Sequence, residues 1–361
     1  MRKENIHKIL FIAVILTAVS CAKTVIEGPN TAGKRFFEAW MQVNHPGKQP
    51  TGLGIYVLEE EPGDSQTTVT EDGYVFVEYI STDLNGVITA YTDSLTAKQL
   101  GNYSASAYYG PQPLMTADGT IQAGLQCAMT NMKVNGRKKV VIPSWLMSYS
   151  TYSSEQEYLD KATDYSDAIY DFRIVDFTKD IYKWQTDSIG RFFGNDKIDI
   201  FIARNKVADV FDGMTDVDSV KQENGGFYGF YYKQVAPPEN DKTFPSDTTV
   251  YINYTGRLLN GKVFDTTDEK IAKNSGIFNS ATTYAPVQIN WGESYTDITM
   301  GSNSTSVIDG FALTLWQMKS MEKGVGVFYS PLGYGNSGSG STIPAYAPLF
   351  FEIELVTAPE E

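Results

Sequence analysis

Residues 250–256 read VYINYTG, and residues 259–265 read LNGKVFD. At the first stretch, Thr249–Tyr254 alternates and is rich in β-forming residues, which predicts a strand there. Two later segments, Val325–Tyr329 and Leu349–Val356, also predict strands, whereas Gly310–Met321 spaces its apolar residues as a helix does. Several short strands around one helix predict an α+β domain with an antiparallel sheet.

An earlier part of the chain repeats this pattern. Residues 54–56, Gly-Ile-Tyr, recur 175 positions later as Gly-Phe-Tyr, and Leu-Asn-Gly at 84–86 recurs at the same distance. Further matches follow in order at distances of 175 to 188, which accidental matches would not do. We therefore predict two copies of one domain, at about 50–177 and 224–358. The further matches pair Tyr79 with Tyr254, Ile121 with Val307, Gly124 with Gly310, Met132 with Met318, Pro143 with Pro331 and Phe172 with Phe351.

The first copy is expected to contain the same elements as the second. Its strands are predicted at Tyr74–Ile80, Lys138–Ile142 and Ala168–Val175, and its helix at Ala123–Met132.

The N-terminus has the features of an export signal. Basic residues precede an apolar run at Ile9–Val19, and Cys21 follows this run closely. Such an order is typical of a secretory signal peptide, and the run is too short for a permanent membrane helix. We expect residues 1–20 to be a signal peptide and residues 21–49 to form a tether and a helix.

The composition excludes several classes of function. The chain has 361 residues, and 29 Lys and Arg against 43 Asp and Glu give a net charge of −14, which argues against nucleic acid as a partner. Only two histidines occur, and His45 is the one outside the signal, so a Ser–His–acid set or a histidine metal site is not expected. Cys127 lies in an apolar helical context and is interpreted as a small core residue. We expect no metal and no cofactor.

Two amphipathic segments lie outside the copies. Each is expected to form a helix that docks on its neighbouring domain, with a helix that binds a partner as the alternative. The residues that share one helical face are Phe36, Phe37, Trp40 and Met41 in the first segment, and Ile181, Trp184, Ile189, Phe192 and Phe193 in the second. Residues 178–223 are then a connector that is helical at its start and acidic later. Its acidic residues lack the ligand order of an EF-hand loop, which favours a solvated loop over a calcium site. These acidic residues are Asp209, Asp212, Asp216 and Asp218.

Taken in order, the motifs of the second copy resemble those of the FKBP-type peptidyl-prolyl cis–trans isomerases. The two stretches at 250–265 are followed by Val-Ile-Asp-Gly-Phe at 307–311, Tyr-Gly at 334–335 and Ile-Pro at 343–344. The resemblance implies, for each copy, an antiparallel sheet curled around one short helix. It also implies rotation of X–Pro peptide bonds in polypeptides without a cofactor.

The end of the export signal, Ala18-Val19-Ser20-Cys21, is similar to the signals of bacterial lipoproteins. In those proteins the chain is cut before the cysteine, which then carries lipid. The resemblance implies lipidation of Cys21 and a membrane anchor in the bacterial cell envelope, facing the periplasm or the outer surface. An ordinary signal peptide that happens to precede a cysteine is the alternative.

The isomerase resemblance also implies which residues bind substrate. Aromatic rings would grip the prolyl ring, while the Ile308 N–H and the Tyr334 hydroxyl would hold carbonyl groups of proline-containing polypeptides. Asp265, oriented by Tyr254, would be a polar wall and not a base, because rotation about an amide moves no proton. The residues implied as catalytic are Tyr254, Phe264, Asp265, Ile308, Phe311, Tyr334 and Phe351, and those implied as substrate-binding are Val263, Val287, Val307 and Ile343.

The second copy departs from the family pattern at several places. Phe311 stands where the family usually has Trp, and Val287 where it often has Phe. Two insertions, Thr266–Ala285 and Glu293–Ser306, flank the expected pocket. If one of them fills the pocket, the protein would be a non-catalytic envelope lipoprotein that binds a protein or a glycan, instead of an isomerase that assists the folding of exported proteins.

The first copy is expected to be inactive. It keeps Tyr79 but has Thr89-Ala90 where the second copy has Phe-Asp. Gln122 and Leu125 replace the isoleucine and phenylalanine that start the second copy's helix. Residues 91–93, Tyr-Thr-Asp, could compensate only if a bulge shifted the register.

Overall fold

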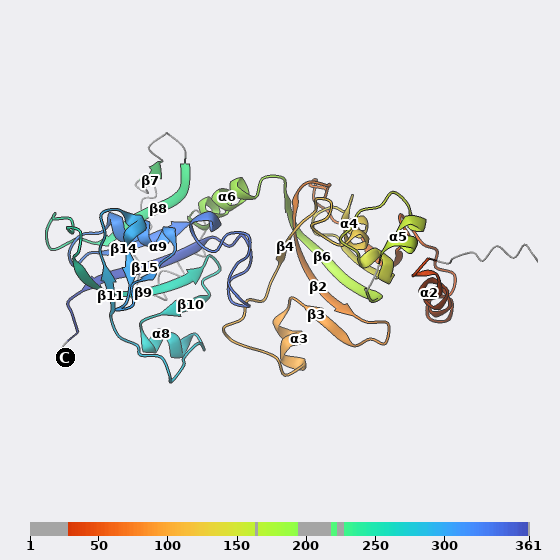
Figure 1. The fold of residues 1–361 in the computed structure, drawn as a ribbon, viewed down its shortest axis with the longest axis horizontal. Coiled ribbons are helices and arrows are strands. Elements are labelled where there is room, and N and C mark those ends of the chain that lie inside the picture. The colour runs from red at the N-terminus through yellow and green to blue at the C-terminus, as the bar shows by residue number, and fades with distance from the viewer. Residues whose placement is uncertain (1–27, 163–164, 194–217, 222–226, 360–361) are drawn as a thin grey trace, which may run out of the picture.

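Two antiparallel sheets organise the chain. The computed structural model describes residues 28–162, 165–193, 218–221 and 227–359. One sheet has six strands and the other nine. Figure 1 shows the sheets in two lobes, with the first sheet on the right beside α4 and α5 and the second on the left beside α9. The predicted α+β class with antiparallel sheets is therefore confirmed.

The first sheet has the strand order β1-β5-β6-β2-β3, with β4 also paired to β2. Its central strands, β6 and β2, carry buried β-branched and aromatic residues on the face toward the core. The strands are β1 (Tyr56–Glu61), β2 (Tyr74–Thr82), β3 (Ile88–Tyr91), β4 (Gln112–Met115), β5 (Arg137–Ile142) and β6 (Ala168–Thr178).

The second sheet has the order β13-β12-β11-β9-β15-β14-β8-β7, with β10 also paired to β9. The stretch VYINYTG at 250–256 lies inside β9. The predicted strand at Leu349–Val356 is β15, which pairs with β9. The strands are β7 (Asp218–Lys221), β8 (Phe227–Ala236), β9 (Thr249–Leu258), β10 (Val263–Thr266), β11 (Val287–Asn290), β12 (Thr299–Met300), β13 (Thr305–Ser306), β14 (Lys323–Phe328) and β15 (Leu349–Val356).

The two sheets share one topology. The order β1-β5-β6-β2-β4, with β3 as a side strand of β2, matches β8-β14-β15-β9-β11 with β10 as a side strand of β9. The pairing registers agree as well, because Tyr56 lies opposite Val141 and Tyr231 lies opposite Val327. This agreement supports the predicted duplication.

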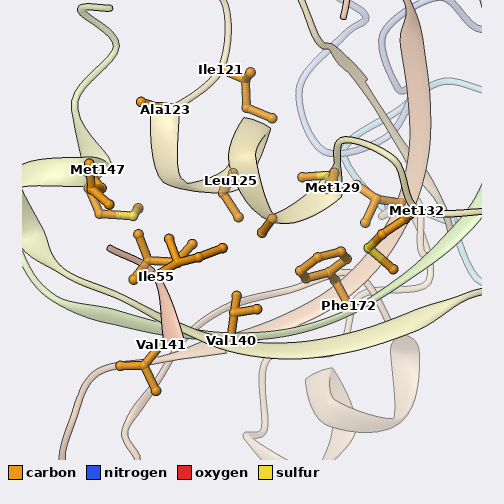
Figure 2. Packing of buried hydrophobic residues seen from close by; sticks show 14 of the residues in the cluster. Ile55, Ile121, Ala123, Leu125, Met129, Met132, Val140, Val141, Met147 and Phe172 are labelled. Carbon is orange, nitrogen blue, oxygen red and sulfur yellow. The ribbon is translucent and has the colours of Figure 1, made fainter. Parts of the chain in front are cut away.

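One helix packs on each sheet. Figure 2 shows Leu125 and Met129 of α4 above Val140 and Phe172 of the first sheet. In the second copy, Phe311 and Leu315 of α9 are buried in the core cluster of that copy. The helices are α2 (Thr31–Asn44), α3 (Ser94–Gln99), α4 (Ala123–Met129), α5 (Glu155–Lys161), α6 (Ile181–Phe193), α8 (Glu269–Asn274) and α9 (Asp309–Gln317), with short 3-10 turns η1 (Ser144–Met147), η3 (Tyr295–Asp297) and η4 (Ser330–Leu332).

Both of these helices are shorter than predicted. The helix α4 ends at Met129 instead of Met132, and α9 ends at Gln317 instead of Met321, because extended residues follow at Thr130 and Met318. Met321 itself has a φ of 59°, a left-handed conformation that a right-handed helix does not contain. The predicted C-terminal ends are therefore wrong, while the presence and place of each helix are confirmed.

Strand pairing corrects two of the predicted repeat matches. Phe172 lies opposite Tyr79, the place that Ile353 takes opposite Tyr254. Tyr170 is the true counterpart of Phe351, because these two residues lie opposite Ser81 and Gly256. The prolines do not correspond either, since Pro143 precedes η1 whereas Pro331 lies within η4. The Phe172 error comes from the different lengths of the loops before β6 and β15, whereas Pro143 directly follows β5 and so corresponds to Tyr329, which directly follows β14.

The helices outside the copies dock largely as predicted. In α2, Phe37 and Met41 are buried, but Phe36 is 63% exposed and does not belong to the docked face. In α6, Ile181 and Ile189 are buried, and Ile189 packs on strands β14 and β15 of the second copy.

The end of the predicted connector belongs to the second sheet. Strand β7 begins at Asp218 and pairs with β8, so Asp218 lies in a strand and not in a solvated loop. Other predicted features lie outside the described residues, namely the signal peptide, Cys21 and the acidic residues Asp209, Asp212 and Asp216. Among the helices that the structure describes, none combines the length and the apolar character needed to cross a membrane.

Candidate active site

Four aromatic rings of the second copy meet on the inner face of its sheet. Phe351 of β15 lies at the centre, with ring centroids 5.1 Å from Phe311 of α9 and 5.5 Å from Phe264 of β10. Tyr254 of β9 lies 5.4 Å from Phe311 and 6.3 Å from Phe351. The edge-to-face geometry of most of these pairs is the favourable one for aromatic rings. The structure thus brings together four predicted aromatic residues that come from four different elements.

A glycine makes this cluster possible. A Cβ atom on Gly256 would lie 2.6 Å from the ring of Phe264 and 2.8 Å from the ring of Phe351. Real Cβ atoms do not approach other atoms so closely, so only glycine leaves room for both rings. The Tyr-Thr-Gly motif therefore has a direct packing reason.

The polar wall of the site is a tyrosine–carboxylate pair. The Tyr254 hydroxyl donates a hydrogen bond of 2.6 Å to Oδ2 of Asp265, which fixes the predicted orientation of this carboxylate. Burial raises the pKa of Tyr254, and the negative charge of Asp265 raises it further. The phenol therefore stays protonated as a donor, while Asp265 is exposed to solvent.

A further part of the site is a loop that follows η4 and spans residues 333–346, called the rim loop below. The N–H groups of Gly333 and Gly335 both donate to the carbonyl of Ser330, at 2.8 Å each, which turns the chain around Tyr334. Tyr334 is 37% exposed, and burial together with the charge of Asp265 raises its pKa. Ile343, at the other end of the loop, is buried in the core cluster of the second copy.

The remaining predicted site residues differ in how far they are buried. Ile308 is the N-cap of α9, and its carbonyl accepts from the N–H groups of Phe311 and Ala312. Val307, Ile308 and Val287 are partly buried against the core cluster. Val263 is buried at 4% exposure, so its side chain is not open to a substrate in this conformation. The site therefore has a buried apolar floor, a half-buried aromatic wall and a polar, exposed rim.

The first insertion is not peculiar to the second copy. Asp268 caps α8 by accepting from the Ile271 N–H, and Asp93 caps α3 in the same way from Thr96, both at 2.8 Å. Each insertion also ends in a stacked ring pair, Tyr103 with Tyr109 and Phe278 with Tyr284. The segment 91–110 is thus the first copy's version of 266–285, and both are called arms below.

The hypothesis that Asp93 replaces the missing carboxylate is wrong. Asp93 caps α3, and the register of β3 places Ala90 opposite Ser81, as Asp265 lies opposite Gly256. The first copy still has a hollow of about 180 Å³ at the corresponding place. Its lining includes Tyr79, Gln122, Leu125, Tyr149 and Tyr170.

One contact of the site could not be found from the motifs of the second copy. Tyr108, from the arm of the first copy, packs against the core cluster of the second copy. Its backbone N–H donates a 2.7 Å hydrogen bond to the carbonyl of Ser341 in the rim loop. No motif predicts this contact, because Tyr108 and Ser341 belong to different copies and neither residue is part of a motif quoted above.

His45 and Cys127, the side chains considered above for acid–base, metal or nucleophilic chemistry, lie outside the aromatic site of the second copy. His45 ends α2 with its ring 5.5 Å from that of Trp40, and burial lowers its pKa. Cys127 is a free thiol at intermediate exposure, so it is less buried than predicted. Within the described ranges, no three His, Cys, Asp or Glu residues gather into a group that could hold a metal.

A chain of several FKBP domains is among the solved structures that align with this chain. The three FKBP domains of wheat FKBP73 align with 84% of this chain and 94% of that chain, at 14% identity and a TM-score of 0.28. Because this TM-score is low, the family assignment rests on the sequence comparisons that follow.

Comparison with known sequences identifies the second copy. Residues 240–356 match the family model of the FKBP-type peptidyl-prolyl cis–trans isomerases. The chain is 30% identical over 128 residues to a probable FKBP-type peptidyl-prolyl cis–trans isomerase of Haemophilus influenzae, and 26% identical over 129 residues to the macrophage infectivity potentiator of Trypanosoma cruzi. Each match covers 36% of this chain, and it spans about half of each relative, 42% and 53%. Residues 240–356 therefore form a domain of the FKBP-type peptidyl-prolyl cis–trans isomerase family.

Proposed function

We propose that the second copy is a peptidyl-prolyl cis–trans isomerase that acts on X–Pro bonds of exported polypeptides, and that the first copy is inactive. The observation that carries the proposal is the Tyr254–Asp265 hydrogen bond beside the Phe264, Phe311 and Phe351 rings. This arrangement combines an apolar floor for a prolyl ring with a fixed polar wall. The corresponding position of the first copy has Ala90 and no carboxylate.

The chemistry requires no nucleophile and no metal. Rotation about an X–Pro bond crosses a barrier because amide resonance must be lost, about 18–20 kcal/mol for a peptide bond. The twisted amide has less charge separation than the planar one, so an apolar floor favours it relative to the ground state. The Tyr334 hydroxyl and the Ile308 N–H would hold the flanking carbonyl groups while the bond turns.

The test is an isomerisation assay of the whole chain on a short X–Pro peptide. We expect Phe264→Ala and Asp265→Ala each to lower kcat/KM by about tenfold or more, which corresponds to roughly 1.4 kcal/mol of transition-state stabilisation. Thr89→Ala, at the position of the first copy that corresponds to Phe264, is the matched control and should leave the rate unchanged. A wild-type rate equal to the uncatalysed rate would refute the proposal.

A non-catalytic binding module is the second candidate function, and one observation favours it for the first copy. That copy keeps a hollow of about 180 Å³ although it lacks the phenylalanine and the carboxylate. If the whole protein were such a module, X–Pro peptides would bind without acceleration of isomerisation. Binding that survives while the assay stays at the uncatalysed rate would select this alternative.

We further propose that the protein is a lipoprotein of the bacterial cell envelope, anchored through Cys21. The support is the signal-like sequence at 1–20 followed directly by this cysteine. Cys21→Ser should move the protein from the membrane fraction to the soluble fraction of cells that export it. Membrane association that survives this substitution would contradict the anchor.

A further inference from the structure

The arm of the first copy, residues 91–110, touches the second copy beside its site. The carbonyl of Ala105 accepts a hydrogen bond from Nζ of Lys262, two residues before Phe264. A Cβ on Gly276 would lie 2.8 Å from Cβ of Ala105, so the two arms pack closely against each other. The arm is therefore held at the edge of the second copy that carries β10.

The tip of the same arm reaches the rim loop. The Tyr108 N–H donates to the carbonyl of Ser341 at 2.7 Å, and its ring packs on the second copy's core cluster. The ring of Tyr74 from β2 also meets the ring of Tyr346 edge-to-face at 5.2 Å. Two points of the rim loop are thus supported by residues of the first copy.

The rim loop borders an open space on this side. A cavity of about 540 Å³ lies between the copies, and its lining includes Tyr108, Pro344, Tyr346 and Trp184. Gly338 and Gly340 within the loop have positive φ values of 64° and 52°. Hydrogen bonds within the loop, from the Ser339 N–H to the Ile343 carbonyl and from the Tyr346 N–H to the Gly335 carbonyl, define its shape, whereas the bond from the Tyr108 N–H to Ser341 holds it to another segment.

We infer that the first copy is a positioning part of the second copy's site, because its Ala105–Tyr108 segment fixes the rim loop between Tyr334 and Ile343. This inference rests on the proposed isomerase function. Tyr108 acts through the loop and touches no reacting atom, so it is a positioning residue. The expected consequence of its loss is weaker capture of the substrate, with a smaller effect on the chemical step.

The test compares Tyr108 variants of the full chain in the isomerase assay and in hydrogen exchange. Tyr108→Ala removes the ring that packs on the second core, and we expect KM to rise roughly three- to tenfold with kcat changed less than about twofold. Amide exchange in 333–346 should become faster, while exchange in β9 and β15 stays the same. Tyr108→Phe should keep the wild-type values of both, because it loses only a 3.3 Å hydrogen bond to the carbonyl of Pro111.

Two further variants keep the test decisive. Thr283→Ala alters the position of the second arm that corresponds to Tyr108 and should have no effect. Lys262→Met removes the bond to Ala105 without touching the first copy, and should reproduce the exchange result if Tyr108→Ala fails to fold. Unchanged KM and unchanged loop exchange in the folded variants would overturn the inference. An inactive wild type would refute the proposed function instead, and loop exchange would still report whether the arm fixes the loop.

Discussion

The two copies have the same framework and different sites. In both, a threonine side chain accepts from a tyrosine N–H at 2.9 Å, Thr92 from Tyr79 and Thr267 from Tyr254. The next residue caps the arm helix in each copy. In the site, by contrast, the first copy has Ser81, Thr89 and Ala90 where the second has Gly256, Phe264 and Asp265. The copies therefore share their turns and helix caps, while the residues that line the site differ, at these three positions and also where Leu125 and Tyr170 stand in place of Phe311 and Phe351.

The largest expected difference between the copies concerns the central ring. Phe351 is 4% exposed and contacts four other aromatic rings, whereas its counterpart Tyr170 is only half-buried. Phe351→Ala should lower the free energy of unfolding of the second copy by about 3–5 kcal/mol, because it leaves a cavity in the core. Tyr170→Ala should cost the first copy less, about 1–2 kcal/mol.

Denaturant unfolding followed separately for each copy would measure this difference. Phe351→Leu serves as the control, since it fills part of the cavity and should cost less than the alanine variant. Equal losses for Phe351→Ala and Tyr170→Ala would show that the ring cluster adds no stability beyond ordinary burial.

Much of the framework was predictable from the sequence, because it depends on local patterns. The alternation of Thr249–Tyr254 and the β-forming residues of Leu349–Val356 predicted β9 and β15, and the repeat predicted their counterparts. Helix ends were predicted less well, since Thr130 and Met318 leave the helical conformation for reasons that apolar spacing does not reveal.

The site was predictable where motif and geometry coincide, as in the Tyr254–Asp265 pair. The identity of Tyr170 as the counterpart of Phe351 was not, because matching letters favoured Phe172 and only strand register resolves a shift of two residues. The contact of Tyr108 with the rim loop was also hidden, since it depends on how the two copies lie together.

A second, smaller effect on stability is expected when Gly256 and its counterpart in the first copy, Ser81, are each replaced by the other copy's residue. Gly256→Ser would place a side chain where the Phe264 and Phe351 rings now lie, and should cost about 1–3 kcal/mol through overpacking, with loss of isomerase activity. Ser81→Gly in the first copy removes a 2.8 Å hydrogen bond to Thr89 and should cost about 0.5–1.5 kcal/mol. Thermal unfolding and the isomerase assay measure both, and an active Gly256→Ser variant would contradict the packing argument.

The smallest expected effect is a change in the pKa of Tyr254 or Tyr79, and it tests directly what the carboxylate of Asp265, which the first copy lacks, does in the site. Burial raises the pKa of both Tyr79 and Tyr254, but only Tyr254 has a carboxylate beside it that makes the phenolate still less favourable. Asp265→Asn removes that negative charge, so the pKa of Tyr254 should fall toward that of Tyr79. Ala90→Asp adds a charge near Tyr79, so the pKa of that phenol should rise. Ultraviolet difference titration follows both phenols, with Tyr254→Phe and Tyr79→Phe identifying the signals. If Ala90→Asp left the titration of Tyr79 unchanged, the two positions would not be equivalent in space, and the loss of the first copy's site would need a cause other than this one carboxylate.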